Sequence, residues 1–481
     1  MTFAWADLRK LAQYANDRLA RRQGAVVLLG ALFLTWPAIY NGFPLLYPDS
    51  MTYLGDGPTV ARAVFLHRFS QYYGVRSFFY SLGILPFHWN VTAWPVVGLQ
   101  CLLAAWVLWL LARSISARHL AARYLILMLL LSLFTSVSWY CSFIMPDILG
   151  PLVYLGLYLL VFARETLTRA ERWALSLLAW WGITAHASHF LLAGGLCLLL
   201  AMLAAFQWRT FKSRLRSLGE AAAIVALAAA AQMALHGYLY GKPSLNGERP
   251  PYLMARIIAD GPGRWYLEKH CEKGQWAVCD RFRVLSDNPD DLLWGPESAQ
   301  EADFEAERDR EVREEMPFVL ATVRAYPREQ LLKSAANFKD QLMAFGPYGF
   351  DPSPWILAEF NQVLPGARPA FMRSRQEHET LPLDQMADIQ WWTVITSLAA
   401  IAVLIPFLWR RHSPRLAGIS IAVFSTVAAN AFVTGVLSVV DDRYQCRVIW
   451  LVPLLAGLFV IDWLHQREMA RLSRAGAPAP N

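Results

Sequence analysis

The chain has 481 residues, of which 56% are hydrophobic and only 17% are charged. The apolar residues gather in long blocks, a composition that excludes an ordinary soluble protein and indicates a membrane protein with several spans. The formal net charge of +7 does not indicate nucleic acid as a partner, because the basic residues lie between the apolar blocks, where they have a topological explanation.

The apolar blocks predict about ten transmembrane helices, since a hydrocarbon core about 30 Å thick takes roughly 20 apolar residues in a helix. The predicted spans cover residues 24–44, 91–112, 124–142, 147–163, 173–189, 191–208, 220–240, 391–409, 416–438 and 446–464. Alternate connections carry Lys and Arg, so the positive-inside rule places both ends of the chain in the cytoplasm. A basic stretch, residues 8–22, precedes the first span without a cleavage site in reach, and we expect that span to be retained.

These spans divide the chain into a predicted N-terminal transmembrane module, residues 1–240, and C-terminal transmembrane helices, residues 391–466. The first outer loop, residues 44–90, contains an aromatic segment over residues 75–89 that predicts an amphipathic helix lying in the membrane interface. Residues 467–481 end in Ala, Pro and Gly and are predicted to form a disordered cytoplasmic tail.

Residues 241–390 form the largest outer connection and predict a mainly helical extracytoplasmic domain. Its charged run, residues 297–315, favours a solvated helix face over a docking surface for another protein. Apolar residues at helical spacing over residues 330–345 predict a helix that packs back onto the membrane part. Cys271 and Cys279 are close in sequence in an oxidising compartment, which favours a disulfide over two free thiols or a zinc site.

Two acidic residues directly follow prolines in the first and second outer connections, Asp49 in Tyr47-Pro48-Asp49-Ser50 and Asp147 in Met145-Pro146-Asp147. Each could simply cap the turn or helix that begins there. If the two connections converge on one face of the bundle, the paired carboxylates would suit acid–base chemistry or a divalent cation.

His186 and His189 lie three residues apart near the outer end of the fifth predicted span and project from about one face. They could bind a metal ion or a phosphate. A hydrogen-bonded pair at the interface is at least as consistent with the sequence, because two histidines at this spacing are a weak indication of metal binding.

Arg443 and Arg447 are the basic residues of the outer turn before the last span, against the usual charge bias of outer connections. A guanidinium group can grip a phosphate through two parallel hydrogen bonds. The placement therefore predicts a phosphate-binding site, with local ion pairs to Asp441 or Asp442 as the alternative.

In these features the chain resembles the GT-C superfamily of membrane glycosyltransferases, which includes the protein O-mannosyltransferases and the aminoarabinose transferases of lipid A. Those enzymes are similar in having an acidic residue just after the first helix, another between helices three and four, and a large outer domain. The resemblance implies that Asp49 is the base or a metal ligand, that Asp147 is the second acidic residue, and that Arg443 holds the lipid phosphate.

The resemblance implies a GT-C-like fold in a bacterial inner membrane and transfer of a sugar from a polyprenyl-phosphate donor to a lipid, glycan or protein acceptor. Asp49 would act as the base, and Arg443 with Arg447 would bind the phosphate. Secondary candidates for contacts with the sugar or phosphate are His67, Arg68, Arg76 and Lys242. The alternatives are a transporter or lipid flippase, a non-enzymatic envelope assembly factor, and another membrane transferase such as an O-antigen ligase.

Overall fold

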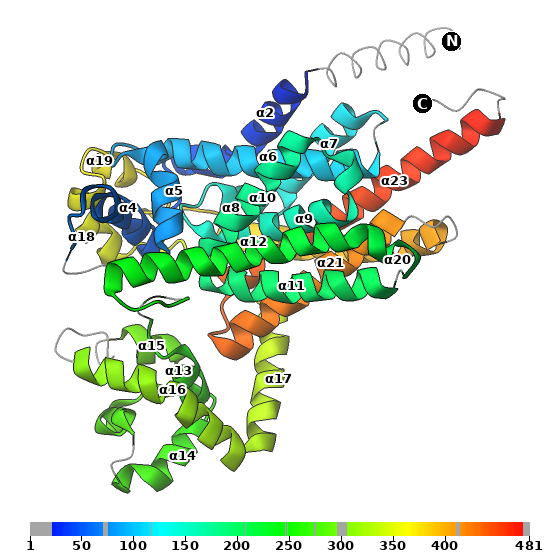
Figure 1. The fold of residues 1–481 in the computed structure, drawn as a ribbon. Coiled ribbons are helices and arrows are strands. Elements are labelled where there is room, and N and C mark those ends of the chain that lie inside the picture. The colour runs from blue at the N-terminus through cyan, green and yellow to red at the C-terminus, as the bar shows by residue number, and fades with distance from the viewer. Residues whose placement is uncertain are drawn as a thin grey trace.

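A computed structural model describes residues 22–70, 76–116, 118–206, 208–245, 247, 249–273, 276–295, 305–409 and 414–474. Within these residues the regular structure is helical, as the sequence predicts, and a single bridge of extended backbone joins Leu45 to Phe143. Figure 1 shows a bundle of long helices with a smaller helical group below it. The predicted basic stretch, residues 8–22, falls almost entirely outside the described part.

Six of the described helices are long and apolar enough to cross a membrane, which is consistent with an integral membrane protein. They cover Trp94–Ile115, Ala187–Ala205, Arg214–Tyr240, Leu383–Pro406, Arg415–Val436 and Asp442–Arg471. These segments belong to helices α6 (Trp94–Ile115), α11 (Ala187–Phe206), α12 (Trp208–Tyr240), α20 (Leu383–Trp409), α21 (Pro414–Ala431) with the π-helical turn η6 (Phe432–Val436), α22 (Asp442–Ile449) and α23 (Leu451–Arg474). Each corresponds to one of the ten predicted spans.

The other four predicted spans contain shorter helices, so the count of ten is not confirmed. These helices are α2 (Gln23–Leu34), α7 (Leu120–Phe134), α9 (Leu149–Phe162) and α10 (Arg169–Thr184), of 12, 15, 14 and 16 residues. At about 1.5 Å per residue, none reaches the roughly 30 Å of a hydrocarbon core. The first predicted span breaks at Thr35, where α3 (Trp36–Asn41) begins with Pro37 in its first turn.

Burial separates central helices from peripheral ones. Every residue of α9 is buried, and α6 and α23 are mostly buried as well. By contrast, α12 and α20 leave large apolar side chains open, including Leu227 and Trp392. Apolar side chains on the outside of a membrane bundle face lipid, so α9 lies at the centre and α12 and α20 at the periphery.

One end of the bundle gathers the basic connections that give the predicted orientation. There Arg113 pairs with Glu171 at 2.7 Å, and Arg415 pairs with Glu165 at 2.6 Å. Arg113 lies 13 residues beyond the buried Gln100 of α6, which corresponds to about 20 Å along the helix. The outer connections around Gln100 therefore lie at the opposite end of the bundle.

At that opposite end, short helices replace open loops. The first outer connection forms α4 (Pro48–Leu66) and α5 (Phe78–His88), and the later chain adds α18 (Pro354–Val363) and α19 (Arg368–Phe371) beside them (Figure 1). The predicted aromatic helix of residues 75–89 thus exists as α5, although residue 75 lies outside the described part. The amide of Gln376 bonds both the N–H and the carbonyl of Leu46, which fixes the path of the chain into α4.

The outer domain has a small apolar core of its own, centred on Phe318. It consists of α13 (Tyr252–Ala259), α14 (Pro262–His270), α15 (Pro289–Trp294), α16 (Glu305–Ala325) and α17 (Pro327–Met343), with a disulfide between Cys271 and Cys279. The prediction of a solvated charged helix holds only in part for α16. Arg310 and Glu314 form an ion pair at i and i+4 on the exposed side, but Glu311 and Glu315 are buried. They pair with Arg281 and Arg249, which are distant in sequence, and residues 297–304 lie outside the described part.

The helix α17 returns to the bundle, as predicted for residues 330–345, and ends against η6. The contact depends on Gly435, because a Cβ atom there would lie 2.6 Å from Cβ of Gln341 and 2.8 Å from the carbonyl oxygen of Asn337. At the C-terminal end of the chain, α23 continues to Arg474. The predicted tail of residues 467–481 is therefore helical up to that residue, and residues 475–481 lie outside the described part.

The close approach of α17 to η6 predicts different results for two glycine substitutions. Gly435→Ala forces the helices apart and should lower the free energy of unfolding by about 1–3 kcal/mol. Gly98→Ala in α6, where nothing lies within 4 Å of the new Cβ, should leave stability unchanged or raise it slightly. Thermal unfolding in detergent compares them, and equal midpoints would contradict the close contact.

Candidate functional site

A short stretch of paired backbone brings the first and second outer connections together. The Leu45 N–H donates to the Ser142 carbonyl at 2.9 Å, and the Ile144 N–H donates to the Leu45 carbonyl at 3.0 Å. The amide of Gln100 also donates to the Phe143 carbonyl at 2.8 Å. Asp49 follows one strand of this bridge by four residues, and Asp147 follows the other by three or four, so both enter the same region.

Asp147 lies buried between two arginines of the last outer turn. It is only 2% exposed. One carboxylate oxygen lies 3.4 Å from Nη1 of Arg447 and 4.0 Å from Nε of Arg443. The other oxygen, Oδ2, is buried and has no hydrogen-bond partner among the described residues. Asp147 therefore acts as a buried counterion, and its side chain makes no helix-cap hydrogen bond.

Arg447 is held on several sides by polar groups. Its guanidinium donates to the Asn430 side-chain oxygen at 2.9 and 3.2 Å and to the Ser188 hydroxyl at 3.1 Å, besides its contact with Asp147. It is 1% exposed. Such a fixed guanidinium contributes positive charge to the site but has few donors left for a ligand.

Arg443 differs, because much of its hydrogen-bonding capacity is unused. Its Nε and Nη1 atoms are buried and have no hydrogen-bond partner among the described residues. Its guanidinium carbon lies 4.3 Å from the ring centre of Tyr47 and 5.0 Å from that of Tyr444. Buried donors without acceptors are costly, so this arginine is prepared for an anion that the chain itself does not supply.

The turn that carries both arginines is fixed from the outer side. The Asp441 carboxylate accepts the Arg443 backbone N–H at 2.8 Å and caps α22, while Asp442 accepts the Gly346 N–H. The Gln341 side chain of α17 bonds both backbone groups of Asp441. The alternative of local ion pairs with Asp441 or Asp442 is therefore not what the structure contains, since both arginines face Asp147.

Asp49 lies in the first turn of α4 and pairs with Arg76. The distance between Asp49 Oδ1 and Arg76 Nη2 is 2.7 Å, and both side chains remain partly exposed. The cap of α4 comes from the Ser50 hydroxyl, which accepts the Tyr47 N–H at 2.9 Å. Asp49 is thus not needed as the cap and stays accessible at the edge of the charged cluster.

The buried side chain of Tyr53 lies near both halves of the site. Burial raises its pKa, and the charges of Asp49, Arg76, Asp147 and Arg443 also act on it. All four charged groups are therefore close enough to influence this one side chain. Asp49, Asp147 and Arg443, which the sequence analysis selected separately, lie in one cluster.

The two histidines lie beside the arginines. Burial lowers the pKa of His186 well below its ordinary value, and His189, Arg447 and Arg443 lower it further. His186 is hydrogen-bonded to Ser188, which also binds Arg447. The Nε2 atom of the buried His189 has no partner among the described residues. At neutral pH, His186 is an uncharged imidazole next to a positive cluster.

The outer domain adds residues that the sequence analysis missed. The Trp294 ring of α15 covers the guanidinium of Arg76 at 5.0 Å. Tyr252 also contacts Arg76, and burial raises the pKa of that tyrosine. Burial raises the pKa of Asp290 as well, and Asp441 and Arg443 act on its charge. Helix α15 therefore covers the site, a placement for which the sequence offers no periodic or motif signal.

Three of the secondary candidates lie elsewhere. His67 ends α4 on the exposed side and contacts the Tyr238 hydroxyl at 2.8 Å. Arg68 and Lys242 are exposed. The described contacts of these three side chains do not include any member of the charged cluster, whereas Arg76 belongs to it.

The donor set does not fit a divalent cation. Asp49 and Asp147 are each paired with arginine, and the described residues contain no group of three or more His, Cys, Asp or Glu side chains that could hold a metal ion. Guanidinium groups repel a cation, so the cluster suits an anion.

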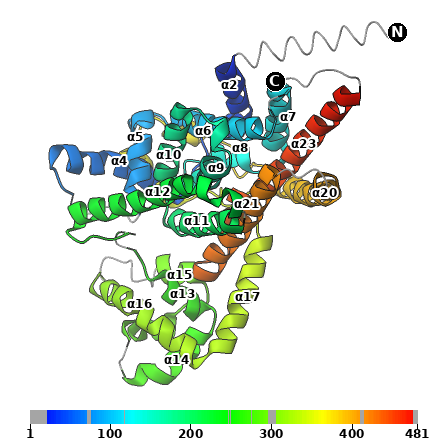
Figure 2. The ribbon, with the colours of Figure 1, turned by 45° about the vertical axis from the view of Figure 1, so that its right-hand side comes forward.

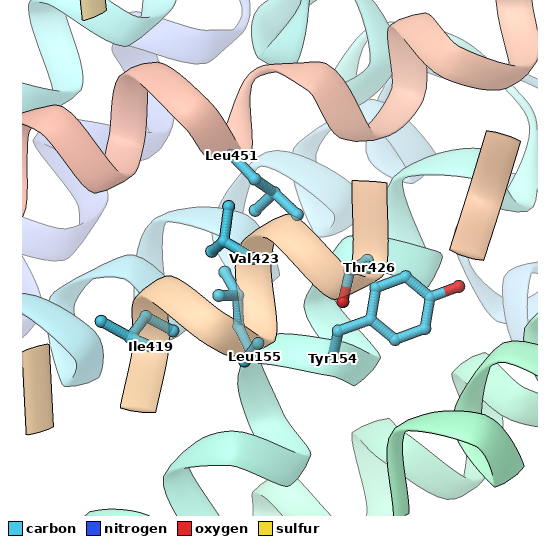
Figure 3. Close-up of a pocket in the computed structure, with 7 residues that line it drawn as sticks. Tyr154, Leu155, Ile419, Val423, Thr426 and Leu451 are labelled. Atoms are coloured by element: carbon cyan, nitrogen blue, oxygen red, sulfur yellow. The ribbon is translucent and has the colours of Figure 1, made fainter. Parts of the chain in front are cut away.

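A narrow apolar recess lies inside the bundle near the arginines. Residues of α9, α21 and α23 line it (Figure 3). They are Tyr154, Leu155, Ile419, Ala422, Val423, Thr426 and Leu451. The charge of Arg447 acts on Tyr154, so the recess lies near the charged cluster, but its lining side chains pack too closely to admit a water molecule.

The burial of Asp147 predicts a strong dependence of stability on its charge. Asp147→Asn leaves two buried guanidinium groups without a counterion and should cost about 3–5 kcal/mol. Asp49→Asn is the matched control, because its partner Arg76 is partly exposed, and it should cost less than about 1 kcal/mol. Thermal unfolding in detergent measures both, and equal losses would contradict the role of Asp147.

No protein-family model, curated protein or solved structure matches the chain. Arguments about its activity therefore rest on the geometry of the charged cluster and the chemistry of its side chains. That cluster contains a buried carboxylate, three arginines, two histidines and one partly exposed carboxylate, at the end of the bundle opposite the basic connections.

Proposed function

We propose that the chain is an integral membrane glycosyltransferase that transfers a sugar from a polyprenyl-phosphate donor to a hydroxyl acceptor. The observation that carries the proposal is Arg443, a buried guanidinium with unused donors. A phosphate diester supplies the acceptor oxygens and the negative charge that these donors require.

The neighbours of Arg443 support phosphate at this position. Arg447 and Arg76 add positive charge, and the neutral His186 can donate or accept a hydrogen bond. Asp147 balances part of this positive charge, and the remaining positive charge attracts an anion. The rings of Tyr47 and Tyr444 restrict the arginine to one orientation.

The apolar exterior of the bundle supports a lipid-linked donor. A polyprenyl chain needs apolar surroundings next to its phosphate, and the peripheral helices expose large apolar side chains such as Leu227 and Trp392. The donor phosphate would lie at Arg443 with its chain in the lipid, which leaves the sugar near α4 and α15.

Asp49 is the proposed general base. The acceptor oxygen forms a bond to the anomeric carbon while the bond between that carbon and the phosphate oxygen breaks. The bonding electrons leave with the polyprenyl phosphate, beside Arg443, and the proton of the acceptor hydroxyl passes to Asp49. This single displacement inverts the anomeric configuration. Arg76 holds the Asp49 carboxylate in place through its 2.7 Å contact.

Transfer assays in proteoliposomes test the proposal, with a panel of radiolabelled polyprenyl-phosphate hexoses and pentoses and with extracted envelope lipids and glycans as acceptors. Asp49→Asn should lower transfer at least about 100-fold, the range expected for loss of a general base. Arg443→Ala should raise the KM for the donor, because it removes the phosphate ligand.

Asp351→Asn is the matched control, since it makes the same chemical change at an exposed outer carboxylate, and it should keep full activity. Full activity of Asp49→Asn would overturn the proposed base. Movement of labelled lipid across the membrane without sugar transfer, by the wild-type protein, would favour a flippase instead.

The arginine-paired carboxylates also predict that transfer does not need a divalent cation. Activity should persist after incubation with excess EDTA and should not rise when Mg²⁺ or Mn²⁺ is added back. Loss of activity with EDTA and recovery with one of these ions would contradict the assignment of Asp49 as a base paired with Arg76.

A further inference from the structure

The turn between α16 and α17 carries apolar side chains on its outside, although it belongs to the outer domain. On α17, Leu331 is 70% exposed and Leu332 is 61% exposed. On α16, Met316, Leu320 and Val323 are also exposed and follow one another at helical spacing. The opposite side of α16, with Phe318, is buried in the domain core. A helix surrounded by water would place polar residues on its outward face, so this stripe has another partner.

The position of α17 indicates where this apolar face lies relative to the membrane. Its C-terminal half packs on Gly435, at the end of the candidate span Arg415–Val436. Leu332 precedes Asn337 by five residues, or about 8 Å along the helix. Figures 1 and 2 both show α17 crossing the direction of α12 instead of continuing it. The apolar face therefore extends sideways from the end of a membrane span.

Basic side chains lie next to the apolar face. Arg324, Arg328 and Lys333 lie exposed beside the apolar residues. Long basic side chains next to a partly inserted apolar face are typical of helices that lie in a lipid headgroup layer, because the side-chain stems cover apolar surface while the charges reach the phosphates.

We infer that the α16–α17 turn, defined by Met316, Leu320, Val323, Leu331 and Leu332, inserts into the outer leaflet of the membrane and anchors the outer domain to lipid. The partner is the bilayer surface, with anionic headgroups bound by Arg324, Arg328 and Lys333. Such an anchor joins the domain to the membrane on the side opposite its covalent link to α12. It thereby holds α15 in position over the charged cluster.

Fluorescence quenching in proteoliposomes tests the anchor with the full-length chain. A single cysteine replaces Leu331 or, as the matched control, Glu329, which is exposed in the same turn of α17 but points to the other side of the helix. Both variants carry Cys197→Ser, because Cys197 is the half-buried free cysteine and the other free cysteines of the described residues are buried. Each is labelled with an environment-sensitive fluorophore in vesicles of phosphatidylcholine and phosphatidylglycerol.

The label at position 331 should emit at shorter wavelength than the label at 329, and it should be quenched by a lipid with a nitroxide near its headgroup but not by aqueous iodide. The label at 329 should show the reverse. Equal quenching by iodide at the two positions would overturn the anchor. The label at 331 could also be protected from iodide only at high protein-to-lipid ratio and become accessible at low ratio. That result would overturn the anchor, because it would mean that a second copy of the chain covers the face.

Discussion

The ion pairs of Asp147 with Arg443 and Arg447 are the interaction on which the outer end of the bundle depends. One carboxylate and two guanidinium groups are buried together there. The free-energy cost of burying any one of them without an opposite charge would be too high. The pairing joins the start of α9, a fully buried helix, to α22 at the beginning of the last span. Because Arg447 also binds Asn430 and Ser188, four segments of the bundle meet at this one charge cluster.

The two arginines of the cluster differ in how many of their hydrogen-bond donors have partners. Arg447 is saturated with partners, whereas two donors of Arg443 have no partner among the described residues. The pair of Asp49 and Arg76 is partly exposed. This asymmetry separates structural charges from charges available to a ligand. It also gives the outer domain a function that its size alone does not indicate, because Trp294 and Tyr252 cover Arg76, while the outer-domain helix α17 fixes the turn that carries Arg443.

The sequence predicted well those features that follow from local placement. Asp49, Asp147 and Arg443 all stand directly at the ends of apolar blocks, so their convergence could be expected from topology. The contributions of Trp294 and Asp290 could not, because they depend on how the outer domain folds over the bundle. The count of ten spans is not confirmed. One reason is that a helix ends at Thr35 and Pro37 within an apolar block, and hydropathy does not register such a break. Local spacing predicted the exposed pair of Arg310 and Glu314, but not the burial of Glu311 and Glu315, because their partners Arg281 and Arg249 are not their helical neighbours.

The extended bridge between Leu45 and Phe143 has a consequence for how this region can change in evolution. It fixes the two carboxylates by residue count, since Asp49 is the fourth residue after Leu45 and Asp147 is the fourth residue after Phe143. Asp49 then enters a helix in which each added residue turns the side chain by about 100°. One inserted or deleted residue between Leu45 and Asp49 would turn α4 by about 100° relative to the bridge, and would direct Asp49 away from Arg76 and the other side chains of α4 away from their present partners. Length variation should therefore be tolerated beyond α4, but not within this five-residue segment.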